Sequence, residues 1–179
     1  MFAGIIYDVY QWQQQVFDGS DKTFEMLRRP DTVVTIGVVG DKIIVLRDEQ
    51  PHRGVRMTFP GGRADNGQEP TLLAAKRELL EETGYEFNDW KLVHVMQKHT
   101  KIEWFIYVFV AWNGAQTTQP HLDPGEKIEV SLVPFGTAKE ISADSYNAEA
   151  TKLFEPLTSV EDVLALPEFV GKRVEINTN

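Results

Sequence analysis

Residues Gly61–Tyr85 read GGRADNGQEPTLLAAKRELLEETGY, the most informative segment of the chain. Near its end, Glu78, Glu81 and Glu82 stand at positions i, i+3 and i+4, which lie on one face of an α-helix within reach of a single cation. Leucines fall on the opposite arc: Leu72, Leu79 and Leu80, with Leu73 at its edge. The spacing predicts a helix that buries its leucine face and leaves its glutamate face open.

The charges of this helix are unfavourable for an ordinary helix end. Glu81 and Glu82 occupy the last turn before Gly84, a glycine suited to a helix C-cap. Basic residues are preferred in that turn because the helix dipole is negative there, and like charges three or four residues apart repel. A divalent cation would offset both penalties. The alternative is a solvated acidic face of the kind found on many surface helices.

The residues before the helix favour the cation. A strand-like segment, Arg56–Phe59, leads into a Pro-Gly-Gly turn at residues 60–62. Glycines allow the backbone to approach a ligand closely, and a backbone carbonyl oxygen can join carboxylates around a hard cation. Glu69 comes within reach of Arg77 when the intervening loop folds back.

This combination resembles the Nudix box, the loop–helix signature of hydrolases that act on nucleoside diphosphates linked to another moiety. From Glu69 to Gly84 the residues match its pattern throughout. The sequence departs from the pattern in a loop one residue longer between Gly62 and Glu69, and in Tyr85, where the pattern has an aliphatic residue. The longer loop leaves open which glycine carbonyl, that of Gly61 or Gly62, faces the metal.

The resemblance implies a fold and a metal site. The fold is the Nudix α-β-α sandwich, an α/β architecture with a mixed central sheet. The metal is Mg²⁺ or Mn²⁺, and its expected ligands are Gly61, Glu78, Glu81 and Glu82. Four further motif residues have structural roles, namely Gly62, Glu69, Arg77 and Gly84.

The resemblance extends to the ADP-ribose pyrophosphatase branch of that family. Glu49–Gly54 looks like the Glu-Gln-x-Arg segment of the branch, which implies that Gln50 and Arg53 bind ribose or phosphate oxygens. For Arg53 the alternative is an ion pair with a surface acid. Aromatic side chains can also stack on a nucleobase. The candidates are Trp12, Trp104, Phe105 and Tyr107, of which Trp104 is taken as substrate-binding, although aromatics in strands are more often part of a core or interface.

The same branch implies a general base on a loop after the motif and just before a late strand. His121–Val130 looks like that region, and Pro124-Gly125 marks a turn. Glu126 then lies on the loop and is the preferred base, and Glu129 lies in the strand and is the second candidate. The alternative for Glu126 is an ordinary solvated glutamate. If neither residue is the base, Glu78 is the expected proton acceptor.

Composition is consistent with one globular domain and excludes several functions. The chain has 179 residues, of which 42% are hydrophobic and 25% charged. The net charge of −9 argues against binding to nucleic acid or to an anionic membrane. No apolar stretch is long enough for a membrane span, and the N-terminus does not resemble a secretory signal. Zero cysteines exclude disulfides and a cysteine nucleophile, and suit a cytoplasmic protein.

The rest of the chain predicts strands followed by short helices. We expect residues 1–30 to form an N-terminal β-hairpin extension that pairs with a second subunit in a homodimer, and residues 31–179 to form the Nudix domain. The expected strands are Tyr7–Phe17, Thr23–Leu27, Thr32–Val39, Lys42–Leu46, Lys91–Met96, Trp104–Trp112 and Ile128–Val133. The expected later helices are Thr137–Ile141, Ala148–Phe154 and Ser159–Leu164.

These expectations lead to one main function and two alternatives. The main one is metal-dependent hydrolysis of the pyrophosphate bond in a nucleoside diphosphate derivative, ADP-ribose or a nucleoside diphosphate sugar, giving a nucleoside monophosphate and a phosphate ester. The first alternative is a Nudix-fold module that senses a nucleotide without cleaving it. The second is an acidic-helix domain that binds Ca²⁺ or another protein.

Overall fold

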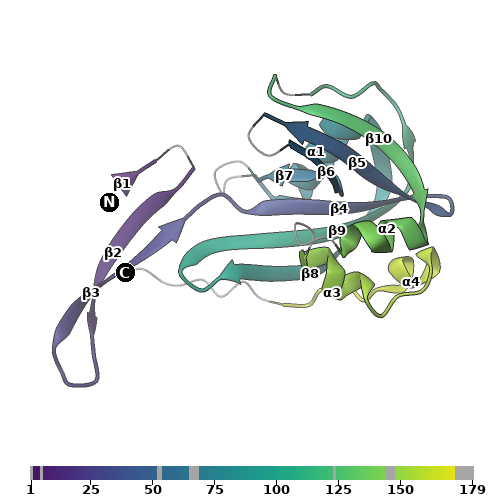
Figure 1. The fold of residues 1–179 in the computed structure, drawn as a ribbon. Helices are drawn as coiled ribbons and strands as arrows, with labels where there is room; N and C mark the ends of the chain where they lie inside the picture. The colour runs from purple at the N-terminus through teal and green to yellow at the C-terminus, as the bar shows by residue number, and fades with distance from the viewer. Residues whose placement is uncertain are drawn as a thin grey trace.

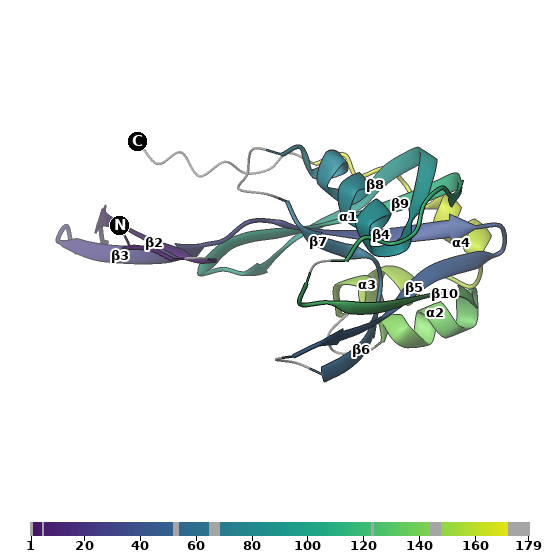
Figure 2. The same cartoon turned by 90° about the horizontal axis from the view of Figure 1, so that it is seen from above.

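A computed structural model shows an α/β fold in which a mixed sheet lies between helices (Figures 1 and 2). It describes residues 2–4, 6–51, 54–64, 69–122, 124–143 and 148–171. The strands are β1 (Phe2–Ala3), β2 (Asp8–Gln15), β3 (Asp21–Arg28), β4 (Thr32–Val39), β5 (Lys42–Gln50), β6 (Gly54–Thr58), β7 (Gly61–Arg63), β8 (Tyr85–His99), β9 (Ile102–Gln116) and β10 (Lys127–Pro134). The helices are α1 (Thr71–Thr83), α2 (Phe135–Ser142), α3 (Ala148–Phe154) and α4 (Val160–Ala165). The predicted fold class is confirmed.

The sheet combines parallel and antiparallel pairs. Its order is β1-β2-β3-β9-β4-β5-β10, with β6 beside β5, β7 beside β4 and β8 beside β9. Strand β9 is parallel to β4 and to the end of β3, whereas the other pairs are antiparallel. The tight turn between β4 and β5 contains Gly40 in the left-handed region, with φ of 60°. These two strands, both predicted, therefore form a hairpin.

The side chains of β4 alternate between the two faces of the sheet and pack in two different clusters. Val33 packs with Ala74 and Ala75 of α1, whereas Ile36 belongs to a larger cluster that includes Phe154 of α3. Because successive side chains of a strand point to opposite faces, α1 covers one face of the sheet and α2–α4 cover the other, as Figure 2 shows. This arrangement puts the predicted glutamates on the α1 side.

Helix α1 is rotated relative to the predicted arc. Leu72 and Leu73 are exposed at 37% and 53%, whereas Leu79 is 1% exposed and Glu82 is 9% exposed. The small side chains at Ala74 and Ala75 let the helix lie close to the sheet, and they form the buried surface together with Leu79, Glu82 and Thr83. The predicted division into a buried leucine face and an open glutamate face is wrong for Leu72, Leu73 and Glu82.

Several elements extend beyond their predicted bounds. Strands β8 and β9 are 15 residues each and contain the shorter segments expected there. Gly61 and Gly62, predicted as part of a turn, instead belong to β7, which pairs with β4. The start of α4 is as predicted, because the Ser159 hydroxyl accepts a hydrogen bond from the Asp162 N–H and the Asp162 carboxylate accepts one from the Ser159 N–H.

Strands β2 and β3 form a hairpin that projects from the rest of the chain (Figures 1 and 2). Its contacts with β9 include the pairing of Leu27 and Arg28 with Ile102 and Glu103. The Tyr10 hydroxyl also donates to Glu103 Oε2 at 3.0 Å. One face of the hairpin carries Tyr10, Trp12, Phe24 and Met26, and the opposite face carries Gln11, Gln13, Thr23 and Glu25. The hairpin is therefore amphipathic.

Candidate active site

Gly84 fixes the C-terminal end of α1, the end that carries the glutamates. Gly84 ends the helix in the left-handed region, with φ of 71°, and its N–H donates to the Leu80 carbonyl. A Cβ atom on Gly84 would lie 2.1 Å from the Thr118 carbonyl oxygen. Only glycine therefore fits at this position, both for its backbone conformation and for the close approach of the neighbouring chain.

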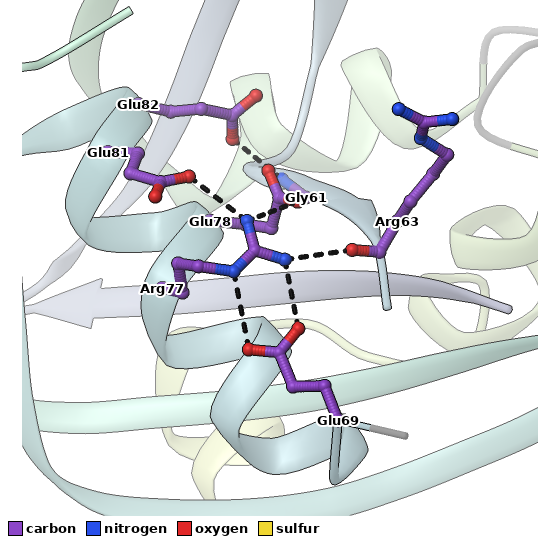
Figure 3. Close-up of polar contacts among 7 residues, drawn as sticks. All are labelled: Gly61, Arg63, Glu69, Arg77, Glu78, Glu81 and Glu82. Atoms are coloured by element: carbon purple, nitrogen blue, oxygen red, sulfur yellow. Dashed lines mark hydrogen bonds and ion pairs between the residues drawn. The ribbon is translucent and has the colours of Figure 1, made fainter. Parts of the chain in front are cut away.

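Arg77 connects the loop to the helix through five hydrogen bonds (Figure 3). Its Nε and Nη2 donate to the two oxygens of Glu69 at 3.3 and 3.0 Å. The same Nη2 donates to the Arg63 carbonyl at 3.0 Å, and Nη1 donates to Glu78 and Glu81 at 2.9 and 3.1 Å. A guanidinium has five N–H donors, so all of them are used within the protein.

The two glycines of the motif lie directly against the carboxylates. The Gly61 N–H donates to Glu82 Oε2 at 2.8 Å (Figure 3). A Cβ atom on Gly62 would lie 2.4 Å from the Glu78 carboxyl carbon. Position 62 therefore has no room for a side chain while the Glu78 carboxylate keeps its position.

Burial and neighbouring carboxylates raise the pKa values of Glu82 and Glu78. Burial raises the pKa of Glu82 well above its usual value, and the charges of Glu78, Glu126 and Asp48 raise it further, although the hydrogen bond from Gly61 opposes the shift. Burial also raises the pKa of Glu78, with smaller increases from Glu81 and Glu126, against the lowering effect of Arg77. Negative charge is therefore concentrated here beyond what Arg77 offsets.

This donor set suits a hard divalent cation, which prefers carboxylate and carbonyl oxygens. Within the described ranges, no three His, Cys, Asp or Glu side chains are already arranged as metal ligands around one point. Arg77 accounts for part of this, since it holds oxygens of Glu78 and Glu81. The helix brings Glu78, Glu81 and Glu82 together near Gly61 (Figure 3).

The two candidate bases lie in different surroundings. Glu126 precedes β10 and is close enough to Glu78 and Glu82 to raise the pKa of both. Glu129 lies within β10 and forms an ion pair with Arg47 of β5 at 3.3 Å, with 62% of its side chain exposed. The structure brings Glu126, and not Glu129, to the carboxylates of α1.

Of the three predicted substrate-binding residues, the structure describes Gln50 and Trp104. Gln50 ends β5 and donates from Nε2 to Asp48 Oδ2 at 3.3 Å, whereas Arg53 lies outside the described residues. Trp104 packs against the cluster on the α2–α4 side, and its indole N–H donates to Thr32 Oγ1 at 3.0 Å. The guanidinium of Arg29 lies 4.2 Å from the centre of the Trp104 ring. The structure does not bring Trp104 to the carboxylates.

Asp48 is a site residue that the sequence did not indicate. It is 5% exposed and contributes to the raised pKa of Glu82. Its only signal in the sequence is a carboxylate that continues a buried strand, two residues after Leu46. A buried acid in a strand is uncommon and is a reason to look for a functional neighbour.

Comparisons with known proteins agree with this geometry. Residues 28–154 match the NUDIX domain family. The ADP-ribose pyrophosphatase of Bacillus subtilis (strain 168) is 27% identical over 173 residues, which cover 92% of both chains. A methanol dehydrogenase activator of Bacillus methanolicus is 28% identical over 88 residues, 48% of this chain and 47% of that protein.

Two solved structures share the fold. An ADP compounds hydrolase aligns over 92% of this chain and 90% of its own, with a TM-score of 0.68 and 20% identity. A MutT structure from work on Aliivibrio salmonicida and Vibrio cholerae aligns over 71% of this chain and 96% of its own, with a TM-score of 0.54 and 20% identity. The family match covers most of the chain and includes the glutamate helix, so the chain belongs to the NUDIX family and is a Nudix pyrophosphohydrolase that resembles ADP-ribose pyrophosphatases.

Proposed function

We propose that the protein hydrolyses the pyrophosphate bond of ADP-ribose or of a nucleoside diphosphate sugar in a reaction that requires Mg²⁺ or Mn²⁺. The products are a nucleoside monophosphate and a phosphate ester. The observation that carries the proposal is the crowding of Glu78, Glu82 and Glu126. Besides burial, the charge of Glu126 raises the pKa of Glu78 and of Glu82, and the charge of Glu78 raises that of Glu82. Such a set is costly for a protein unless a cation binds there.

The proposed metal ligands are Glu78, Glu81, Glu82 and the Gly61 carbonyl. When bound, a divalent cation neutralises charge on the diphosphate and makes water more acidic. Arg77 and Glu69 have a different role in the proposal. Their paired hydrogen bonds fix the loop against the helix, so they orient the ligands without contacting substrate.

Glu126 is the proposed general base. It directly precedes β10, and its charge acts on Glu78 and Glu82, which supports a role beside the attacking water. In the proposed reaction Glu126 accepts the proton of that water as the water oxygen attacks one phosphorus in line with the leaving oxygen.

The substrate class is supported by the similarity to the Bacillus subtilis ADP-ribose pyrophosphatase, which extends over 92% of both chains. Gln50, at the end of β5, remains a proposed ribose or phosphate contact, and Arg53, which lies outside the described residues, remains a second one. Trp104 remains a prediction for nucleobase stacking. Its indole N–H donates to Thr32, and the guanidinium of Arg29 lies over its ring.

We also propose that residues 1–30 are a β-hairpin extension of a Nudix domain that comprises residues 31–179. In the proposed homodimer, this extension packs on a second copy of the chain. The aromatic face of the hairpin supports this, since Tyr10, Trp12 and Phe24 form a continuous row with ring centres 6.0 and 5.9 Å apart. A projecting two-stranded ribbon is marginally stable without such packing. None of the described helices has the length and apolar character to cross a membrane, and the absence of cysteine suits the cytoplasm, where we place the enzyme.

A substrate panel tests the proposed function. The protein is incubated with ADP-ribose, nucleoside diphosphate sugars and dinucleoside polyphosphates, with Mg²⁺, with Mn²⁺ or with EDTA, and the products are identified by mass spectrometry. We expect AMP and ribose 5-phosphate from ADP-ribose with either metal, and no product in EDTA. Tight nucleotide binding without turnover under any of these conditions would support a sensor module instead, and metal binding that nucleotides do not affect would support an acidic-helix domain.

A further inference from the structure

The chain between β9 and β10 passes over the C-terminal end of α1. The last carbonyl groups of an α-helix have no donor within the helix and need one from elsewhere. Residues 117–121, which we call the cap segment, supply such donors. Its first two N–H groups donate to the Gly84 carbonyl at 2.8 and 3.2 Å, and the N–H of His121 donates to the Glu81 carbonyl at 2.7 Å. The cap segment is therefore bound to the end of α1.

The hydrogen bond of His121 falls on the turn that carries the proposed metal ligands. Glu81 accepts from His121 with its backbone carbonyl and from Arg77 with its side chain. The next residue, Glu82, accepts from the Gly61 N–H at 2.8 Å. The side chain of His121 is exposed, so its main chain makes the connection. The cap segment and these two glutamates belong to one hydrogen-bonded unit.

The loop that follows the cap segment is held at its other end by β5. Lys127, the first residue of β10, pairs with Glu49 of β5, and its ammonium group donates to Glu49 Oε2 at 3.1 Å. Glu126 therefore lies between two anchors, the His121 N–H on α1 and the start of β10 on β5. An extended chain spans at most about 3.5 Å per residue, so the two anchors limit where Glu126 can lie.

The direction of β10 turns Glu126 toward α1. Ile128 packs against the buried cluster that contains Leu79 of α1. Because side chains alternate along a strand, the position two residues before Ile128 falls on the same side of the sheet, and this is the position of Glu126. In agreement with that side, the charge of Glu126 acts on Glu78 and Glu82.

We propose that the cap segment positions Glu126 for catalysis through the main-chain N–H of His121. By donating to the Glu81 carbonyl, this N–H fixes the start of the base loop on the turn of α1 that carries the proposed ligands. The inference rests on the proposed function, because it takes Glu126 as the base and Glu81 and Glu82 as metal ligands. It makes His121, which lies outside the Nudix motif, a positioning residue.

Replacement of one amide by an ester tests this N–H alone. Phenyllactic acid, the α-hydroxy analogue of phenylalanine, is introduced at position 121, where an ester oxygen then replaces the donor N–H. The reference is His121→Phe, which keeps the amide and changes only an exposed side chain. The control is the same ester in place of Phe17, which is fully exposed in the turn between β2 and β3. Melting temperatures check that each protein is folded.

The kinetics are measured with ADP-ribose at saturating Mg²⁺. Relative to His121→Phe, the ester at position 121 should lower kcat at least about 10-fold with little change in KM, because a displaced group that acts only in the transition state is costly for the rate. The ester at position 17 should match the wild type. In a Glu126→Gln background the ester at position 121 should add no further loss, since both changes act through one group. Equal fold losses in both backgrounds, or an unchanged kcat, would overturn the positioning role.

Amide hydrogen exchange tests the connection in the unmodified protein and needs no turnover. Mg²⁺ binding by Glu81 and Glu82 should immobilise the turn to which His121 donates, so the His121 amide should exchange at least about 10-fold more slowly with Mg²⁺ than in EDTA. The control is the Leu157 amide, which donates to the Phe154 carbonyl at 3.0 Å in the cluster on the α2–α4 side and should exchange equally in both conditions.

No slowing at His121, or equal slowing at His121 and Leu157, would overturn the inference even in an active enzyme. Slowing at His121 alone in a protein that cleaves none of the substrates would instead overturn the proposed function, and the connection between the cap segment and α1 would stand.

Discussion

The carboxyl carbon of Glu78 lies 2.4 Å from the position that a Cβ atom on Gly62 would occupy. Two unbonded carbon atoms do not approach so closely, so the Glu78 carboxylate fills the space that a side chain at position 62 would need. The neighbouring atom belongs to the flexible end of a side chain and not to the backbone. Gly62 is therefore required for the position of a proposed metal ligand more than for the fold.

Gly62→Ala is expected to lower kcat/KM by at least about 10-fold while the protein remains folded. The new methyl group displaces the Glu78 carboxylate, and small displacements of reacting groups are costly for catalysis. Activity with ADP-ribose and melting temperature measure the two effects. Gly136→Ala is the control, because a Cβ atom there meets nothing within 4 Å and its effect on activity should be negligible. A wild-type rate for Gly62→Ala would show that the position of Glu78 is not critical.

Glu82→Gln is expected to stabilise the metal-free protein at neutral pH. Burial, and then the charges of Glu78, Glu126 and Asp48, raise the pKa of Glu82. An acid whose pKa is raised on folding contributes its full stability below its unfolded pKa and loses it as the pH rises toward the folded pKa. Glutamine carries no charge and avoids this loss. Melting temperatures in EDTA should show a gain at about pH 7 and none near pH 4, which is below the usual glutamate pKa.

The same variant is expected to lose most of its activity with Mg²⁺ or Mn²⁺, because it removes one negative ligand from the proposed site. A gain in stability together with a loss of activity distinguishes a functional carboxylate from a structural one. Full turnover in EDTA, or a wild-type rate for Glu82→Gln, would refute the metal-site assignment. Failure to gain stability at neutral pH would refute the account of charge crowding.

Much of this site could be predicted from local spacing. The i, i+3, i+4 glutamates, the glycine C-cap and the contact between Glu69 and Arg77 depend on helix geometry and on a short loop, and the last two are present as predicted. The longer strands were recognisable from β-branched and aromatic runs, whereas β1 and β7 were not predicted. The start of α4 was recognisable from Ser159 and Asp162. These features depend on residues close together in the sequence.

The remaining features depend on tertiary packing, which periodicity does not reveal. The rotation of α1 follows from Ala74 and Ala75, whose small size permits close contact with the sheet, and the leucine pattern pointed the other way. Asp48 joins the site through the register of β5 against β6 and β10. Side chains along β9 alternate between the two faces of the sheet, and Trp104 lies on the face covered by α2–α4. The composition of the strand alone does not show which of its residues point to that face.

Glu126→Gln is expected to lower kcat by on the order of 100-fold with little change in KM, as for a group that acts only in the transition state. Glu129→Gln should change kcat little, since the Glu129 side chain is 62% exposed and forms an ion pair with Arg47. The two single variants are compared with ADP-ribose at saturating metal. Loss of activity in Glu129→Gln alone would move the base into β10, and no loss in either would transfer the role to Glu78.

Disruption of the aromatic face of the hairpin is expected to dissociate the proposed dimer. Trp12 lies between Tyr10 and Phe24, with ring centres about 6 Å from each, and large aromatic side chains dominate the energy of interfaces. Trp12→Ser should therefore shift sedimentation at micromolar concentration from dimer toward monomer. Gln13→Ser, on the opposite face of the same strand, is the control and should remain dimeric. A monomeric wild type would refute the assembly, and dissociation by Gln13→Ser but not by Trp12→Ser would place the interface on the polar face.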